Sequence, residues 1–346
     1  MPDSTSDTIV SLHAFLEKYS RLFILAMIIV FMAFTKTEEF WTWSNIQTVV
    51  FQQAPFMILM SFGMTLAIIT KGIDKSMGSV LVFSSILCAN FIKADQFALG
   101  IAIALGIGAA CGLASGILIT RVGVAPFIAT YGVEWVTLGL AFVYTGGVYI
   151  YDFPPEFRNM GIGTTMGIPN LAIITLVIFL ILHFVMRKTI FGRRVYMAGN
   201  NFNATTLSGI DAKNTVTIVY VINGVLAAIT GLLYMARLNA ADPGISATFT
   251  LDSIAASLIG GTSFGGGKGS VASTIIGALI IVFIRNGMNI WGVHTTWQQT
   301  AVGFVIIFSI FLESGTQKIS TIAARQAAAI SQRLTRRFTK SVGKED

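Results

Sequence analysis

The sequence GRRVYMAGNNFNATTLSGID, from Gly192 to Asp211, decides how the rest of the chain is read. It carries two arginines, three asparagines, two threonines and a serine, so it does not belong in hydrocarbon, yet long apolar runs flank it on both sides. The loose spacing of Ala198, Phe202 and Leu207, together with the glycines, predicts a short helix exposed to water. We interpret this stretch as a docking helix for a soluble partner. Taken by itself, an ordinary solvated loop would be the better interpretation, so the rest of the chain must decide.

The composition favours a membrane protein. The chain has 346 residues, of which 54% are hydrophobic and only 11% charged, and its mean hydropathy is +0.75. A soluble domain carries about 25% charged residues. The formal net charge of +7 does not indicate nucleic acid as a partner, because the basic residues are spread between apolar runs and gathered in the C-terminal tail. The expected surroundings are membrane lipid.

The apolar runs predict about ten transmembrane helices, since a helix needs roughly 20 apolar residues to cross a bilayer. One run, Phe249–Gly261, is too short and is expected to be a half-helix or a re-entrant segment. The fold class is therefore an all-α membrane protein. The predicted spans are Arg21–Phe34, Val49–Thr70, Gly78–Ile92, Ala98–Thr120, Pro126–Tyr144, Pro169–Met186, Thr215–Leu238, Phe249–Gly261, Ser270–Gly287 and Thr296–Leu312.

Lysine and arginine predict the orientation. With the N-terminus inside, the inner loops hold eleven basic residues and the outer loops four, before the basic tail is counted. The expected division is a cytoplasmic segment 1–20, a transmembrane domain 21–313 containing a cytoplasmic loop 192–211, and a basic cytoplasmic tail 314–346. The outer loop Gly146–Ile168 is rich in aromatics, which we interpret first as an interfacial belt and second as a face for an external partner.

Two glycine-rich breaks interrupt the apolar runs. In TKGIDKSMGS (Thr70–Ser79), Asp74 precedes a helix start, so we interpret it first as an N-cap and second as a residue of a substrate passage. In IGGTSFGGGKGS (Ile259–Ser270), the Gly-Lys pair is not followed by serine or threonine, and no strand precedes it, so it is not a phosphate-binding loop. Its glycines either permit a sharp turn with close packing or line a polar cavity.

Ionisable residues within apolar runs are candidates for function. Glu134 and Arg285 are the clearest, and they could pair with each other or lie apart. Arg285 is close to a span end, where snorkelling to the interface explains it, and Asp252 fits a helix cap. The scattered histidines have no metal-ligand spacing, and no nucleophile–base arrangement is found. We therefore expect neither a metal site nor an enzyme.

Four stretches together carry a resemblance to a known family. They are TKGIDKSMGS, GRRVYMAGNNFNATTLSGI, LDSIAASLIGGTSFGGGKGS and PFIATYG (Pro126–Gly132). In this order around the predicted spans, they resemble the permease subunit of a ribose-type, simple-sugar ABC importer, from about Asn45 to Leu312. The resemblance implies the ten-helix, type II importer fold typified by the cobalamin permease. It also implies a bacterial inner-membrane location, with both termini cytoplasmic.

The resemblance further implies a set of partners. This chain would bind no cofactor, because ATP and Mg would be held by a cytoplasmic ATPase, usually two fused nucleotide-binding domains. A periplasmic or lipid-anchored sugar-binding protein would deliver the sugar, and a second permease copy or a sister permease would complete the pathway. The residues that match the family's ATPase-coupling loop are Gly199, Asn200, Ala204, Leu207, Gly209 and Ile210. Candidates for the pathway or its gate are Gly72, Asp74, Ser76, Ser79, Glu134, Gly260, Gly261 and Thr262.

Three departures from the family pattern concern the substrate. Lys75 stands where an apolar residue is usual, Glu134 stands where an uncharged one is usual, and the arginine often seen soon afterwards is absent from VTLGLA. They leave the sugar, and pairing with a non-identical permease, open. The expected mechanism is alternating access at a permease dimer interface, driven by the ATPase. The alternative is an ion- or proton-coupled secondary sugar carrier, which would need a relay of buried acids, whereas only Glu134 is available.

Overall fold

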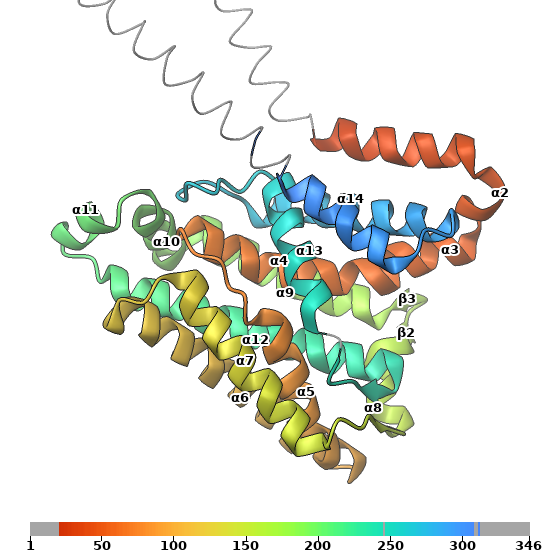
Figure 1. Cartoon of the computed structure of the whole chain (residues 1–346), viewed down its shortest axis with the longest axis horizontal. Coiled ribbons are helices and arrows are strands. Elements are labelled where there is room, and N and C mark those ends of the chain that lie inside the picture. The colour runs from red at the N-terminus through yellow and green to blue at the C-terminus, as the bar shows by residue number, and fades with distance from the viewer. Residues whose placement is uncertain (1–20, 245, 308–310, 312–346) are drawn as a thin grey trace, which may run out of the picture.

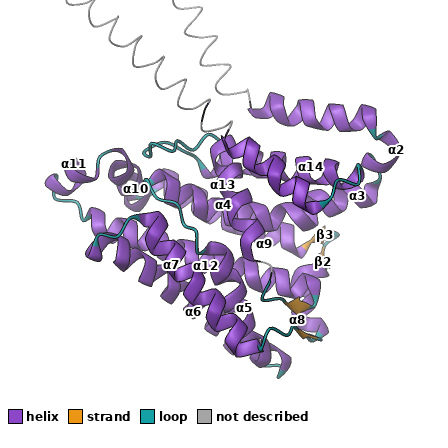
Figure 2. Ribbon diagram, in the orientation of Figure 1, coloured by secondary structure: helices purple, strands orange, loops and turns teal. Residues whose placement is uncertain are grey.

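The structure is a computed structural model that describes residues 21–244, 246–307 and 311. Within these residues the chain is a bundle of helices with four two-residue strands at its edge (Figures 1 and 2). The segment 1–20 and the tail 314–346, both expected to be cytoplasmic, lie outside the described residues.

The elements follow the chain in this order. The helices are α2 (Thr37–Phe40), α3 (Trp43–Gln47), η1 (Thr48–Gln53), α4 (Ala54–Ile69), α5 (Met77–Lys93), α6 (Phe97–Ile117), η2 (Leu118–Val122), α7 (Pro126–Thr145), α8 (Pro155–Ile162), α9 (Asn170–Lys188), α10 (Ile190–Asn200), α11 (Phe202–Leu207), α12 (Ala212–Leu238), α13 (Ser246–Ile259) and α14 (Val271–Ile290). Strand β1 (Ile150–Tyr151) pairs with β4 (Ala240–Ala241), and β2 (Thr164–Thr165) pairs with β3 (Ile168–Pro169), both antiparallel.

Six helical stretches of the described chain are long and apolar enough to cross a membrane. They are Trp43–Ile69, Phe97–Val122, Pro126–Thr145, Asn170–Lys188, Ala212–Leu238 and Val271–Ile290, and each overlaps a predicted span. Three further predicted spans are shorter apolar helices, Arg21–Thr35, Met77–Lys93 and Phe249–Ile259. The last predicted span is helical from 295 to 307 and then leaves the described residues. The predicted total of ten crossings therefore stays a prediction.

The core forms around α4 and α12. Every residue of α4 is buried, and α12 packs against α4, α5, α6 and α8. The contact between α6 and α12 is especially close, because Gly108, Gly112 and Gly116 repeat every four residues along one face of α6. A Cβ added at Gly112 would overlap the carbonyl oxygen of Tyr220, and one at Gly108 would overlap that of Gly224. Only glycine lets these two backbones approach so closely.

The polar stretch after α9 forms two short helices rather than the single one expected. Each helix of this region begins with a side-chain cap: Thr189 accepts from Gly192 N before α10, Asn201 accepts from Ala204 N before α11, and Asp211 accepts from Asn214 N before α12. The break between the two helices falls at Asn201, whose side chain starts α11. These helices lie at one end of the molecule, while α8, β2 and β3 lie at the other (Figure 1).

Candidate functional site

The two glycine-rich breaks and the polar stretch meet at the C-terminal end of α10. The amide of Gly267 donates to the carbonyl of Ile69 at 2.9 Å, so the loop after α13 joins the end of α4. Lys71 Nζ donates to the carbonyl of Asn200 at 3.1 Å, which ties the loop after α4 to the end of α10. Three sequence motifs far apart in the chain thus form a single junction.

Two further contacts fix α10 in this junction. The Tyr196 hydroxyl donates to the carbonyl of Gly269 at 2.9 Å, and burial raises the pKa of this phenol above its ordinary value. Gly199 is buried, and a Cβ there would lie 2.9 Å from Gly267 N and would overlap the carbonyl of Ile69. A side chain at position 199 would therefore push α10 away from α4.

The other five coupling candidates reach the surface. Asn200, Ala204, Leu207 and Gly209 are exposed and Ile210 is half-buried, whereas Gly199 lies inside the junction. Leu207 is 89% exposed at the end of α11, and a polar turn follows it. Gly209 turns the chain with φ +78°, and it has open space around it. The end of α10 is thus packed in the junction, whereas α11 presents an exposed apolar side chain.

A polar cluster surrounds the start of α5. Asp74 is 1% exposed; its Oδ1 accepts from the Ser76 amide at 3.1 Å and from the Ser76 hydroxyl at 2.6 Å, and its Oδ2 accepts from Asn223 Nδ2 at 3.2 Å. The N-cap residue of α5 is Ser76, two positions after Asp74. The N-cap interpretation of Asp74 is therefore wrong: its carboxylate closes a local turn and links that turn to α12.

Lys75 and Glu134 form a half-buried ion pair. Lys75 Nζ lies 2.7 Å and 3.0 Å from the two carboxylate oxygens of Glu134, and the side chains are 17% and 8% exposed. The pair joins the loop before α5 to α7, and the hydrogen bond from Thr137 Oγ1 to Ser79 Oγ at 2.8 Å joins α7 to α5 itself. The two charged departures from the family pattern therefore offset each other.

Arg285 does not pair with Glu134. Its Nη2 donates to Asp252 Oδ1 at 2.6 Å, and its Nε lies 2.6 Å from Asp252 Oδ2. Asp252 is inside α13 rather than at its start, and Arg285 is directed into the bundle from α14. The cap and snorkelling interpretations are wrong, because each charge finds its partner on the neighbouring helix.

The remaining pathway candidates lie at the two breaks. A Cβ at Gly72 would overlap the Tyr220 hydroxyl, and one at Gly260 would lie 2.8 Å from Thr274 Cα. Gly261 adopts φ +81°, which favours glycine, and a Cβ there would overlap the guanidinium of Arg21. Thr262 is buried, and its hydroxyl has no hydrogen-bond partner among the described residues. Close packing therefore explains most of these glycines.

Sequence reasoning missed Tyr220 and Asn223 on α12. Both are fully buried beside Asp74 and the Gly72 turn, and the Tyr220 hydroxyl and Asn223 Oδ1 find no hydrogen-bond partner within the part of the chain that the structure describes. Unpaired buried polar groups are costly, so they mark this cluster as the place for a polar guest or water. The signal available was their i, i+3 spacing inside an apolar run.

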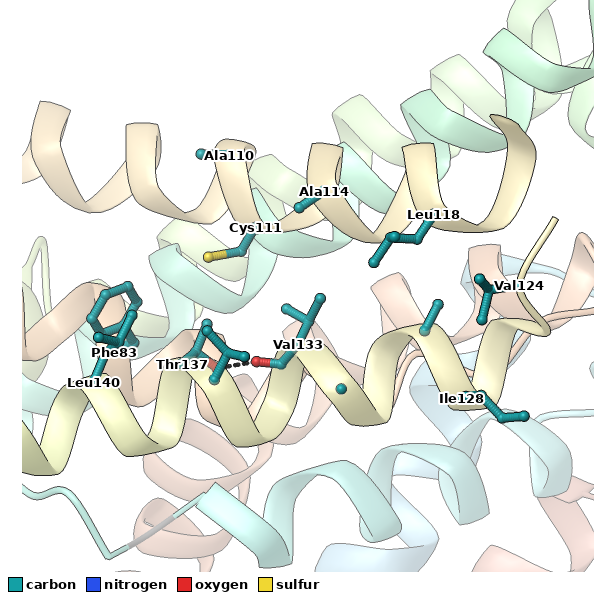
Figure 3. A pocket seen from close by; sticks show the side chains of 13 residues that line it. Phe83, Ala110, Cys111, Ala114, Leu118, Val124, Ile128, Val133, Thr137 and Leu140 are labelled. Carbon is teal, nitrogen blue, oxygen red and sulfur yellow. Dashed lines mark hydrogen bonds between the residues drawn. The ribbon is translucent and has the colours of Figure 1, made fainter. Parts of the chain in front are cut away.

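An apolar groove of about 540 Å³ lies beside this cluster, between α6 and α7 (Figure 3). Its walls include Cys111, Leu118, Ile128 and Leu140, and its hydroxyl at Thr137 is already bonded to Ser79 and to the α7 backbone. A groove with such walls suits a hydrocarbon chain or an apolar helix face and offers a sugar few hydrogen bonds. Among the described residues, no three His, Cys, Asp or Glu side chains are grouped to hold a metal ion.

Comparison with known proteins identifies similar chains. The family model described as branched-chain amino acid transport system / permease component matches residues 46–310. The D-allose transport system permease protein of Escherichia coli strain K12 is 37% identical over 301 residues, covering 86% of this chain and 92% of that protein. The ribose import permease protein of Bacillus subtilis strain 168 is 41% identical over 258 residues, 74% and 80% of the two chains. The ribose import permease protein of Escherichia coli strain K12 is 34% identical over 299 residues, 85% and 93%. No solved structure matches.

Proposed function

The chain belongs to the permease-component family of branched-chain amino acid transport systems, and on that premise we propose that it is the membrane subunit of an ATP-driven importer for a monosaccharide or related small polyol. The family membership confirms the resemblance found in the four sequence motifs. The observation that carries the sugar assignment is the 34–41% identity to ribose and allose permeases over most of each chain. We do not favour the alternative, an ion-coupled secondary carrier, because the Glu134 carboxylate that its relay would need is paired with Lys75.

In this proposal, α10 and α11 form the coupling element. A cytoplasmic ATPase, with two fused nucleotide-binding domains that hold ATP and Mg, contacts the exposed residues of α11 and the following turn. The junction at Gly199 supports this role, because movement of α10 is passed directly to the ends of α4 and of the loop before α14. ATP-driven closure then rocks two permease subunits, a second copy or a sister chain, between inward and outward states.

We further propose an orientation in the bacterial inner membrane, with both termini and the α10–α11 loop in the cytoplasm. The cluster of Arg187, Lys188, Arg193 and Arg194 at the end of α9 and the start of α10 supports that side. A periplasmic or lipid-anchored sugar-binding protein then docks on the opposite face, near α8 and the short strands. The ten-helix importer fold belongs to the same proposal.

The test of coupling replaces Leu207 with aspartate. Leu207 is 89% exposed, so the substitution leaves the fold intact but puts a charge into the apolar contact. We expect ATPase affinity to fall at least about tenfold and sugar-stimulated ATP hydrolysis to be lost, as for a central interface residue. The matched control is Met166→Asp: Met166 is 98% exposed in the turn before α9, at the opposite end of that spanning helix.

The measurement is copurification of a co-expressed candidate ATPase subunit, followed by hydrolysis assays in reconstituted vesicles. Equal ATPase binding by the Leu207→Asp variant and the wild type would remove α11 from the interface. Sugar uptake by the chain alone, with no ATPase present, would refute the importer assignment itself.

A further inference from the structure

A second cavity lies at the boundary between the spanning helices and the coupling element. It measures about 390 Å³, within the roughly 300–1,000 Å³ range of ligand pockets. Its walls come from the end of α9, from α10 and from the start of α14. The lining residues are His183, Met186, Arg187, Arg193, Tyr196, Ser270, Val271 and Ala272.

The cavity is lined by basic side chains. Arg187 and Arg193 both line it, and neither forms an ion pair with any carboxylate in residues 21–244, 246–307 or 311. Ser270, the N-cap residue of the 20-residue helix α14, makes no side-chain cap bond in this structure, so the first amides of α14 add their dipoles at the same place. Tyr196 is held by Gly269 and forms one wall. The cavity therefore fits an anion.

The position of the cavity selects the kind of anion. His183 and Met186 belong to the last turns of the spanning helix α9, and the first turn of α14 is likewise the start of a spanning helix. The side chains of Leu180, Ile181 and Phe184, which precede the cavity along α9, are 56%, 57% and 61% exposed. They form an exposed apolar strip on α9 that extends from the cavity toward the middle of the bilayer.

We propose that this cavity binds the headgroup phosphate of an anionic phospholipid, with the acyl chains lying along the exposed face of α9. The two arginines and the helix N-terminus bind the phosphate through complementary charge, and the apolar strip on α9 makes the hydrophobic contact with the acyl chains. The bound lipid lies between α9 and α10 and stabilises the position of α10 relative to α9. The inference requires a membrane-embedded chain but not that the chain carries a sugar.

The experiment measures lipid retention by the purified full-length chain. Phosphatidylglycerol and phosphatidylcholine with the same acyl chains are added, and the lipids that stay bound are counted by native mass spectrometry. We expect one tightly held phosphatidylglycerol per chain. The Arg187→Gln/Arg193→Gln variant should weaken its retention about 100-fold, roughly tenfold for each charge-assisted hydrogen bond that the phosphate loses.

The matched control is Lys188→Gln/Arg194→Gln, which removes two exposed basic residues next in sequence that do not line the cavity. It should stay within about threefold of the wild type, because solvent-exposed charges outside the cavity contribute little to binding. A second variant, Ala272→Phe, fills the cavity while keeping every charge, and it should lose phosphatidylglycerol to the same degree as the double-arginine variant.

Three results would overturn the proposal. Equal losses in the double-arginine variant and its control would show only surface attraction. Displacement of the lipid by millimolar glycerol 3-phosphate would show a site for a free phosphate. Unchanged lipid retention together with loss of ATPase copurification in the double-arginine variant would show that the cavity receives a carboxylate of the partner protein.

Discussion

The ion pair between Lys75 and Glu134 is largely withdrawn from solvent, with side chains 17% and 8% exposed. Two charges in such a place are retained only as a pair, because removing one leaves the other buried and uncompensated, at a cost of about 3–5 kcal/mol. Replacing both with apolar residues of similar volume is often neutral. The pair is therefore a linked unit, and its two members should not be judged separately.

We predict that Lys75→Met and Glu134→Leu each lower the free energy of unfolding by about 3–5 kcal/mol, and that the double variant recovers most of this loss. Unfolding of the purified chain in detergent measures all three. Lys36→Met is the control, since the Lys36–Glu39 pair is exposed and worth at most about 1 kcal/mol. Additive losses in the double variant would contradict the prediction.

At the residue scale, sequence marks the charged groups but not their partners. Glu134, Arg285, Asp252 and Asp74 stand out because ionisable side chains are rare within apolar runs. Which charge meets which depends on how helices separated by 33 or 59 residues pack together, and the spacing of residues along one helix contains no such information. Arg285 accordingly pairs with Asp252, and Lys75 with Glu134.

Helix α6 is held against α12 by glycine rather than by interlocking side chains. At Gly112 the backbone of α6 lies against Tyr220, and at Gly108 it lies against Gly224. Close backbone contact of this kind drives helix association in lipid, where burial of apolar side chains gives little net gain. The spacing of the glycines makes this face of α6 visible in the sequence.

We predict that Gly112→Leu forces α6 away from α12 and lowers the free energy of unfolding by about 1–3 kcal/mol or more. Gly106→Leu is the matched control, because Gly106 lies on the same helix with nothing within 4 Å of an added Cβ. The thermal midpoint in detergent distinguishes the two. Equal midpoints would mean that α6 and α12 can separate without cost.

At the element scale, the hydrophobic runs predict the six long apolar helices, but the predicted number of helices in the polar stretch is wrong. One short helix was expected, and two are found, α10 and α11. The missed signal is the asparagine pair at 200–201, since Asn201 is a strong N-cap residue and starts α11 within the motif. Burial of Gly199 depends on the glycine loop and the end of α4, which lie elsewhere in the chain.

For the molecule as a whole, the spanning helix α9 separates two surfaces. The turn before it carries Met166, and the loop after it carries α10 and α11. We predict that these surfaces lie on opposite sides of the membrane, with α11 inside. The chain's own thiols are Cys88, which is buried, and Cys111, which is partly exposed, so a cysteine-free background needs only two substitutions.

The measurement uses a membrane-impermeant maleimide on a Cys88→Ala/Cys111→Ala background. Met166→Cys should react in intact cells, and Ser208→Cys should react only after the membrane is opened. Both positions are exposed, so access to the reagent depends on the side of the membrane alone. Labelling of Ser208→Cys from outside would reverse the orientation and remove α11 from the reach of a cytoplasmic ATPase.

The contrast between α10 and α11 in the proposed coupling element has a consequence for how such subunits diversify. Of α11, only Thr205 is buried, whereas α10 is anchored backbone to backbone at Gly199. We therefore predict that replacing residues 202–209 with the corresponding segment of a related permease changes which ATPase this subunit binds. Gly199 cannot be exchanged in the same way, because a side chain there would overlap the carbonyl of Ile69. The partner contact can therefore change during evolution while the contact between α10 and α4 is kept.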